Sequence, residues 1–406
     1  MTSLAQSSFD VASVRSHFPS LVGGAAHFDG PGGSQTPDVV GRAIYDAITG
    51  PLANRGSSTV AEQNAERAVV ECRSAMGDFL GADPAGIVFG RSMTQNTFDM
   101  ARAIAKRWGP GDEVVVTRLD HDANVRPWVA AAGGAGAAVR FADFDPETAE
   151  LDPAEIAKVI TPRTRVVAVT AASNVIGTMP DLISIADIVH AAGAWLYVDG
   201  VHYAAHTPVD VTALGADFFG CSPYKFLGPH CGVLYGRPEL LEQISPDKLL
   251  PAPDVVPEKF ELGTLPYEQM AGTTAAIDFL AGMAASTGSR RDRLMSSMQA
   301  VEAHEDRLRG RIEDVLLGLP GVTLHSRAAR RTPTLLVSFA RHDEQDICRF
   351  LAERSVNAPA GSFYAYEACR RLGLGDAGGL RIGLAPYNDD TDVDRLVEAL
   401  GSYFSL

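Results

Sequence analysis

The sequence predicts an α/β fold, with a mainly parallel seven-stranded sheet covered by helices on both faces and a smaller α+β domain after it. Three observations lead to this prediction. Short β-branched runs, several of them apolar on both faces, alternate with helical stretches. The pattern changes after about residue 280. The length of 406 residues suits one large domain followed by a smaller one.

The N-terminal part is predicted to contain a short helix at residues 11–17, for which Asp10 is a suitable N-cap. A turn rich in Gly and Pro follows at residues 29–37. We expect residues 1–27 to pack with the small domain, residues 28–280 to form the large domain and residues 281–406 to form the small one. The first residues lack a basic start followed by an apolar run, so no secretory signal is expected.

Seven apolar runs are predicted to form the large sheet, and helices separate most of them. The expected strands are residues 87–90, 113–118, 138–142, 165–172, 195–200, 218–222 and 232–236. The last two are close enough in sequence to form a hairpin. The expected helices are residues 61–79, 93–108, 152–160 and 182–192, whereas the Gly- and Ala-rich tract 130–138 is expected to be a loop.

The small domain is predicted to combine helices with a few strands. A charged amphipathic stretch at residues 289–316 predicts one or two helices. It is followed by expected elements at residues 334–339 (strand), 344–354 (helix), 380–384 (strand) and 390–404 (helix).

Charge and cysteine content exclude several classes of function. With 35 Lys and Arg against 50 Asp and Glu, the formal net charge is −15, so we expect no nucleic-acid partner. Five scattered cysteines without a CxxC pair indicate neither a disulfide framework nor a metal site. No run of about 18 apolar residues occurs, so no membrane span is expected. These features together favour a cytoplasmic protein with reduced thiols.

Asp199 and Lys225 are the strongest pair of candidate functional residues. Asp199 ends one predicted strand, where open α/β sheets bind ligands, and Lys225 follows the next strand. Pyridoxal phosphate needs both residue types, because a Lys amine binds its aldehyde and a carboxylate keeps its pyridine nitrogen protonated. Each residue alone has an ordinary explanation, as a turn-capping Asp or a solvated Lys. The pair in this order predicts a pyridoxal phosphate site.

A candidate phosphate site lies at residues 90–97, where a predicted strand leads into a helix. The free amides of Met93 and Thr94, and the Thr94 hydroxyl, can donate to phosphate oxygens at such a helix N-terminus. Taken alone, an ordinary Ser or Thr N-cap explains this segment equally well.

Ordered similarity to a known family extends from about residue 25 to the C-terminus. Besides the Asp199 and Lys225 segments, it rests on FDGPGG at 28–33, NRG at 54–56, HDANVRPW at 121–128, SNVIGT at 173–178, ELGT at 261–264 and RIGLAPYN at 381–388. On these segments the chain resembles the fold-type I pyridoxal phosphate enzymes of the class V aminotransferase group. Within that group it is most similar to the cysteine desulfurase-like proteins.

The resemblance implies roles for residues around the cofactor. Lys225 would hold the cofactor and move the substrate Cα proton, and Asp199 would pair with the pyridine nitrogen. His121 would stack on the ring, unless it is a core histidine bonded to a neighbour. The other implied cofactor contacts are Met93, Thr94, Asn174 and Ser222. Thr264 would reach the phosphate of a partner subunit, which implies a homodimer with shared active sites.

The resemblance also implies how an amino-acid substrate binds. Arg381 would clamp its carboxylate bidentately, with Asn174 nearby, unless Arg381 only forms a salt bridge at the rim. Side-chain specificity would lie in loops that contain Gly32, Arg55, Phe363 and Tyr364.

Three departures separate the chain from true desulfurases. Tyr364 stands where desulfurases carry their nucleophilic Cys, and Cys369 comes five residues too late. Tyr224 replaces a His, although its hydroxyl can still donate to phosphate. His202 replaces a Gln near the cofactor's 3-oxygen, where it can bond that oxygen or act as an acid or base. Tyr364 and His202 therefore join Lys225 and His121 as candidate catalytic residues.

We predict C–S bond cleavage of cysteine or, preferentially, a cysteine S-conjugate by β-elimination, because that reaction needs no enzyme thiol. The alternative within the same chemistry is another reaction of an amino acid, namely decarboxylation-dependent oxidative deamination, transamination or epimerisation. The metabolic role, housekeeping or specialised metabolite biosynthesis, stays open. A non-catalytic scaffold in sulfur trafficking is a second alternative. A dinucleotide-binding dehydrogenase is disfavoured, because no GxGxxG follows a predicted strand.

Overall fold

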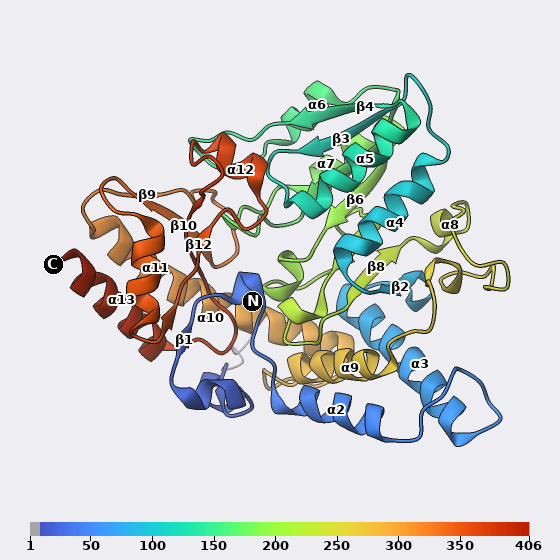
Figure 1. Cartoon of the computed structure of the whole chain (residues 1–406), viewed down its shortest axis with the longest axis horizontal. Helices are drawn as coiled ribbons and strands as arrows, with labels where there is room; N and C mark the ends of the chain where they lie inside the picture. The colour runs from blue at the N-terminus through green and yellow to red at the C-terminus, as the bar shows by residue number, and fades with distance from the viewer. Residues whose placement is uncertain (1–8, 406) are drawn as a thin grey trace, which may run out of the picture.

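A seven-stranded sheet forms the centre of the large part of the protein (Figure 1). The computed structural model describes residues 9–405. The strands are β2 (Ile87–Gly90), β3 (Glu113–Thr117), β4 (Ala138–Ala142), β5 (Thr164–Thr170), β6 (Trp195–Asp199), β7 (Phe218–Cys221) and β8 (Gly232–Gly236). Their order is β2-β8-β7-β6-β5-β3-β4, and β8 alone runs antiparallel to its two neighbours. The predicted, mainly parallel seven-stranded sheet is confirmed, and β7 and β8 form the expected antiparallel pair.

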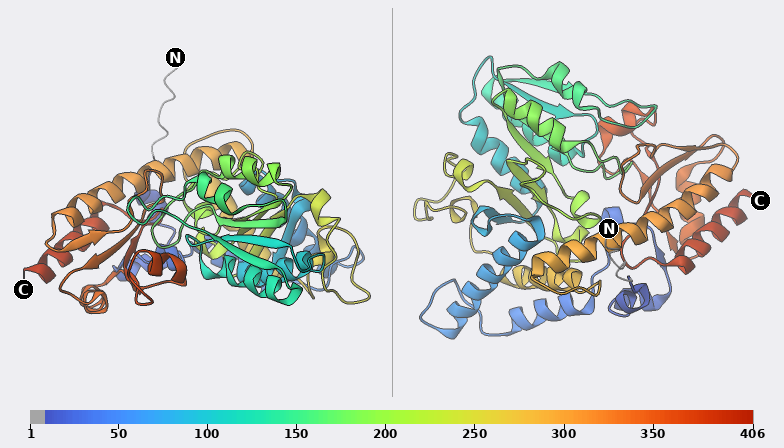
Figure 2. Two further views of the ribbon diagram at one scale, coloured as in Figure 1. Left: turned by 90° about the horizontal axis from the view of Figure 1, so that it is seen from above. Right: turned by 180° about the vertical axis from the view of Figure 1, so that it is seen from behind.

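Helices cover both faces of this sheet (Figure 2). On one face, α4 (Met93–Ala105) and α5 (Arg126–Ala135) pack on side chains such as Val114 and Val116. On the other face, α3 (Val60–Leu80) and α7 (Leu182–Ala191) share a cluster with Val115. α6 (Pro153–Val159) contacts α7 and β4. Because alternate strand residues point to opposite faces, the inner strands covered on both sides are apolar on both faces, as in β5 and β6.

The predicted loop at residues 130–138 is wrong. α5 continues through Ala135 and ends at Gly136, whose φ of 71° gives a left-handed C-cap. Trp128 and Ala132 are fully buried in the cluster beneath the helix. Their packing and the high helix propensity of Ala outweigh the cost of two interior glycines, about 1 kcal/mol each.

Three further helices were not predicted from the sequence. They are α2 (Asp38–Thr49), α8 (Pro238–Leu241) and α9 (Tyr267–Ala281). The last short helix, α12 (Tyr366–Arg371), carries Cys369. α9 packs against α2, α3 and α10, so its apolar residues are spread around the helix instead of forming one stripe.

The C-terminal part contains a four-stranded antiparallel sheet, in the order β12-β13-β10-β9. Its strands are β9 (Val322–Leu324), β10 (Thr334–Phe339), β12 (Ala360–Gly361) and β13 (Gly379–Gly383), and its helices are α10 (Arg290–Gly318), α11 (Glu344–Ala352) and α13 (Asp390–Phe404). Residues 289–316 thus contribute to one continuous helix. Its N-terminus is fixed by a capping box between Ser289 and Asp292.

The N-terminal segment contacts this C-terminal part. β1 (Ala26–His27) pairs in parallel with β11 (Val356–Asn357), and Arg15, the last residue of α1 (Val11–Arg15), forms an ion pair with Asp392 at 2.7 Å. Residues 1–8 of the predicted N-terminal segment lie outside the described residues. The domain boundaries therefore stay a prediction. Between residues 9 and 405, no helix is both long and apolar enough to cross a bilayer.

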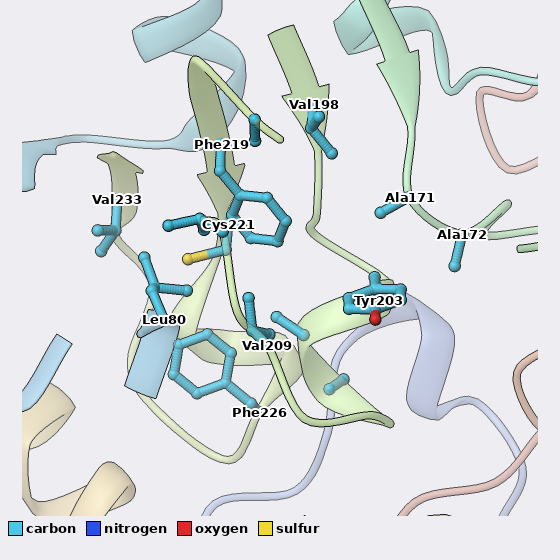
Figure 3. Packing of buried hydrophobic residues seen from close by; sticks show 14 of the residues in the cluster. Leu80, Ala171, Ala172, Val198, Tyr203, Val209, Phe219, Cys221, Phe226 and Val233 are labelled. Carbon is cyan, nitrogen blue, oxygen red and sulfur yellow. The ribbon is translucent and has the colours of Figure 1, made fainter. Parts of the chain in front are cut away.

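The carboxyl ends of β6 and β7 lie in a tightly packed part of the core, which contains the side chains of Val198, Phe219 and Cys221 (Figure 3). Gly200 follows the last residue of β6, and a Cβ atom added there would overlap the ring of Phe219. This close approach requires glycine at the point where the chain leaves the sheet.

We expect Gly200→Ala to lower the free energy of unfolding by about 1–3 kcal/mol, because the new methyl group overpacks the core. Gly134→Ala is the matched control: an added Cβ meets nothing within 4 Å, and the residue lies inside α5. That variant should be neutral or up to about 1 kcal/mol more stable. Urea unfolding of both variants checks the prediction, and equal midpoints would contradict it.

Candidate functional site

A cavity of about 590 Å³ lies between the large sheet and the C-terminal part. It is lined by most of the residues that the sequence singled out, namely Gly32, Met93, Thr94, His121, Asn174, Asp199, His202, Ser222, Tyr224, Lys225, Phe363, Tyr364 and Arg381. The cavity is bordered by residues that follow the carboxyl ends of β5, β6 and β7, which is where open α/β sheets place ligands.

Asp199 and Lys225 face the same cavity from neighbouring strands. Asp199 is the last residue of β6, and Lys225 lies in a short 3₁₀ turn after β7. Burial raises the pKa of Asp199 to about 6, although the Val201 amide donates to its Oδ1 at 3.0 Å. A buried carboxylate of this kind is best stabilised by a cation or an N–H donor in the cavity.

The Lys225 amine is unusually easy to deprotonate. Burial and, second to it, the nearby Arg381 charge lower its pKa to about 7, while Asp199 acts in the opposite direction. Its Nζ donates to the Pro31 carbonyl. At neutral pH a large fraction of this amine is therefore the free base, the form that attacks an aldehyde or accepts a proton.

The cavity lining also includes groups that can bind an anion. α4 begins at Met93, with Ser92 as its N-cap, so that Met93 and Thr94 of its first turn line the cavity. Ser222 and Tyr224 lie at the same cavity. Backbone N–H groups at a helix N-terminus, together with hydroxyl donors, form a suitable phosphate site.

His121 is held as a neutral ring. Its Nδ1 accepts a hydrogen bond from the Ala123 amide at 3.0 Å. Burial lowers its pKa to about 4, and the positive charges of Lys225 and Arg381 contribute. A neutral imidazole whose Nδ1 is already bonded is suited to stacking against an aromatic ligand.

Arg381 brings a buried positive charge into the cavity from β13. Burial lowers its pKa to about 9, which still leaves it charged at pH 7. It donates from Nη1 to the Asn174 carbonyl at 3.1 Å, and its guanidinium lies 3.6 Å from the centre of the Phe363 ring. Its buried Nε has no hydrogen-bond partner among the described residues. The guanidinium can therefore bind an anionic group of a ligand.

Phe363 and Tyr364 form a strained turn at the cavity mouth, with φ angles of 52° and 58°. Two hydrogen bonds hold this turn: Asn174 Nδ2 donates to the Phe363 carbonyl at 3.0 Å, and the Asp122 amide donates to the Tyr364 carbonyl at 2.8 Å. Left-handed backbone at two non-glycine residues costs energy, and such strain is often found at functional sites.

The residues that line the cavity, all within the described range, include no cysteine. The Tyr364 side chain is 68% exposed, and its ring centre lies 5.7 Å from that of His121. Cys369 is buried on α12, where burial raises the pKa of its thiol to about 11. A protonated, buried thiol is a poor nucleophile.

Two predicted site residues do not line this cavity. Arg55 forms ion pairs with Glu66 at 2.8 Å and with Glu258 at 3.2 Å. Thr264 is exposed in the loop before α9. The predicted role of Thr264 involves a partner subunit and stays a prediction, as do the other residue roles.

Several residues at the site were not predicted. Phe98 and Arg126 line the cavity, and Thr332 and Thr334 bond to His202. Phe98 follows Thr94 by four positions on α4, so helical spacing could have identified it. Thr332 and Thr334 carry no local signal, because their contact with His202 is made only in the folded chain.

The residues present fit pyridoxal phosphate. The cavity combines a phosphate-binding helix N-terminus, a carboxylate for a pyridine nitrogen, a reactive amine and a neutral ring for stacking. Buried polar atoms of Asn174, His202 and Arg381 also lack a partner within residues 9–405. Such atoms indicate that a polar ligand completes the site. No group of three or more residues able to hold a metal ion occurs within the described range.

Comparisons of sequence agree with this geometry. The family model for "Aminotransferase class-V" matches residues 26–396. The aminotransferase-like protein FGM3 of Gibberella zeae is 32% identical, over 98% of this chain and 99% of its own length. Cysteine desulfurase CsdA of Escherichia coli is 31% identical, over 97% of both chains.

Solved structures show the same fold. The crystal structure of Escherichia coli CsdA, in its S-sulfonic acid form, superimposes with a TM-score of 0.86 at 30% identity, covering 98% of this chain and 99% of CsdA. An apo cysteine desulfurase from Thermococcus onnurineus has a TM-score of 0.88 at 24% identity, covering 97% and 98%. The predicted fold type I architecture is confirmed.

We expect the rate at which the apoenzyme captures pyridoxal phosphate to rise with pH, with its midpoint near pH 7. Only the deprotonated Lys225 amine attacks the aldehyde, and its pKa is lowered to about 7. Asp199→Asn should shift the midpoint to lower pH, because it removes the negative charge that favours the protonated amine. Stopped-flow absorbance measures the rate. Lys225→Ala should show no covalent capture, and a parent midpoint near 10 would contradict the prediction.

Proposed function

We propose that this member of the class V aminotransferase family cleaves a C–S bond by β-elimination. The chain belongs to that family and is a cysteine desulfurase-like enzyme that depends on pyridoxal phosphate. The substrate would be cysteine or, preferentially, a cysteine S-conjugate. The products would be a thiol, pyruvate and ammonia, with one water molecule consumed when the eliminated three-carbon product is hydrolysed.

The observation that carries this proposal is the absence of a thiol from the lining of the described cavity. Transfer of sulfur to the enzyme requires a thiolate nucleophile near the substrate sulfur. At the matching position the chain has Tyr364, which cannot form a persulfide. Elimination needs a base and a bound cofactor, and both remain available.

Bound pyridoxal phosphate supplies an electron sink that stabilises negative charge at the substrate Cα. In the proposed reaction, Arg381 binds the substrate carboxylate, and Asn174 orients it. The Lys225 amine, a large fraction of which is unprotonated at pH 7, accepts the Cα proton. The sulfur substituent on Cβ then leaves as a thiolate and takes up a proton from solvent.

The side chains that surround the cofactor would set its electronic state and orientation. Asp199 would pair with the pyridine nitrogen, and the neutral His121 ring would stack on the cofactor. Met93, Thr94, Ser222 and Tyr224 would hold the phosphate. Phe363 and Tyr364 would shape the space for the substrate side chain at the cavity mouth.

A homodimer with shared active sites is part of this proposal. Large apolar side chains are exposed on α2 and in the segment that precedes Thr264, namely Tyr45, Ile48, Leu249, Leu250, Val255 and Leu262. In the proposed dimer, the partner subunit would cover exposed apolar side chains of this kind. Light scattering should give twice the 43.0 kDa of the chain.

Incubation of the purified holoenzyme with S-alkyl cysteines should release pyruvate and a free thiol. Lactate dehydrogenase coupling measures pyruvate, and a disulfide reagent measures the thiol. Lys225→Ala is the control and should release neither product. If mass spectrometry instead finds a keto acid that retains sulfur, an inverted Cα or loss of carbon dioxide, then transamination, epimerisation or decarboxylation-dependent deamination replaces the proposal.

We expect Arg381→Lys to reduce kcat/KM for S-alkyl cysteines by roughly 10- to 100-fold, because a Lys ammonium cannot bind a carboxylate bidentately. Most of the effect should be an increase in KM. Arg327→Lys is a control, because Arg327 lies at the protein surface and is absent from the cavity lining. Unchanged kinetics in Arg381→Lys would refute the carboxylate role.

A further inference from the structure

His202 is held from one side by two hydroxyl groups of the C-terminal part. Its Nε2 lies 2.9 Å from Thr332 Oγ1 and 2.9 Å from Thr334 Oγ1. The three side chains are buried. The other ring nitrogen, Nδ1, is buried without a hydrogen-bond partner among the described residues, although His202 lines the cavity beside Asp199 and Lys225. A ligand atom in the cavity is therefore the natural partner of Nδ1.

The hydrogen bonds around the His202 ring determine its tautomer. A neutral imidazole carries one N–H and one acceptor nitrogen. The Thr332 hydroxyl also donates to the Gly177 carbonyl at 3.4 Å. The Thr334 hydroxyl has one hydrogen-bond partner within residues 9–405, which is His202 Nε2. A buried hydroxyl hydrogen needs an acceptor. Thr334 thus donates to Nε2, and the ring hydrogen is on Nδ1, where it can donate into the cavity.

The surroundings keep the His202 ring neutral. Burial lowers its pKa well below the usual value, and the charges of His206, Lys225 and Arg381 act in the same direction. The His206 ring lies 4.7 Å away, edge to face, and its Nδ1 is 2.9 Å from Oε2 of the buried Glu305 on α10. These features favour a His202 ring that stays neutral and donates a hydrogen bond, over one that gains and loses a proton near pH 7.

We propose that Thr334, assisted by Thr332, is a positioning residue that fixes His202 as its Nδ1–H tautomer, so that this N–H donates to the 3-oxygen of pyridoxal phosphate. The inference rests on the proposed cofactor pocket around Lys225, but not on which substrate bond is broken. It means that a strand of the C-terminal part controls the electronic state of a cofactor bound to the large sheet.

Thr334→Val tests this assignment, because it removes the hydroxyl while keeping the shape of the side chain. In the holoenzyme we expect the visible absorption maximum of the bound cofactor to shift and cofactor dissociation to become roughly tenfold more favourable, as for loss of one hydrogen bond to a charged oxygen. Thr334→Ser keeps a hydroxyl and should restore both properties. Nitrogen-15 NMR of histidine-labelled holoenzyme should show a protonated Nδ1 in the parent and a changed pattern in Thr334→Val.

A double-variant comparison separates positioning from general damage. Gln at position 202 carries its own N–H donor, so Thr334→Val should have no further effect on the absorption maximum in a His202→Gln background. Equal shifts in both backgrounds would overturn the proposal, as would an unchanged maximum in Thr334→Val or a parent spectrum with the hydrogen on Nε2. If the parent itself shows no cofactor band, the proposed cofactor pocket fails instead. Thermal unfolding of Thr334→Ser controls for stability.

Discussion

The site depends on burying three ionisable groups in one cavity: two that become cations, Lys225 and Arg381, and one that becomes an anion, Asp199. Each pKa is displaced toward the neutral form by loss of water, and the Arg381 charge also lowers the pKa of Lys225. Burial of unbalanced charge is costly unless a ligand completes the balance. A cofactor and substrate that together supply a phosphate, a pyridine nitrogen and a carboxylate would complete it.

The fold maintains this arrangement through backbone elements packed on both faces. Asp199 ends a strand whose neighbours are apolar on each side, and Gly200 allows the chain to turn away against Phe219. Arg381 lies in β13, which is paired with β10. Asp199 and Arg381 are therefore placed by strands, and Lys225 by a short turn after β7, which limits the space through which they can relax.

The sequence alone was sufficient to predict the strands of the large sheet and most of the functional residues that line the cavity. Asp199 and Lys225 could be found because they end or follow apolar runs, and chain order then places them on neighbouring strands. Contacts between distant segments could not be found. His202 and Thr334 are 132 positions apart and meet only through packing of the two parts. The extent of α5 was missed because local Gly content gave no indication of the burial of Trp128.

The division of the cavity between two parts of the chain has a chemical consequence for the proposed reaction. Arg381 is an electrostatic cause of the lowered Lys225 pKa, second to burial. A substrate carboxylate bound to Arg381 offsets that positive charge. In the proposed reaction, the Lys225 amine would therefore become more basic when the substrate is in place, which is when it would accept the Cα proton. Before substrate binds, the same charge keeps the amine unprotonated and able to hold the cofactor. The Arg381 guanidinium would thus favour the nucleophilic form of Lys225 before substrate binds and a more basic Lys225 afterwards.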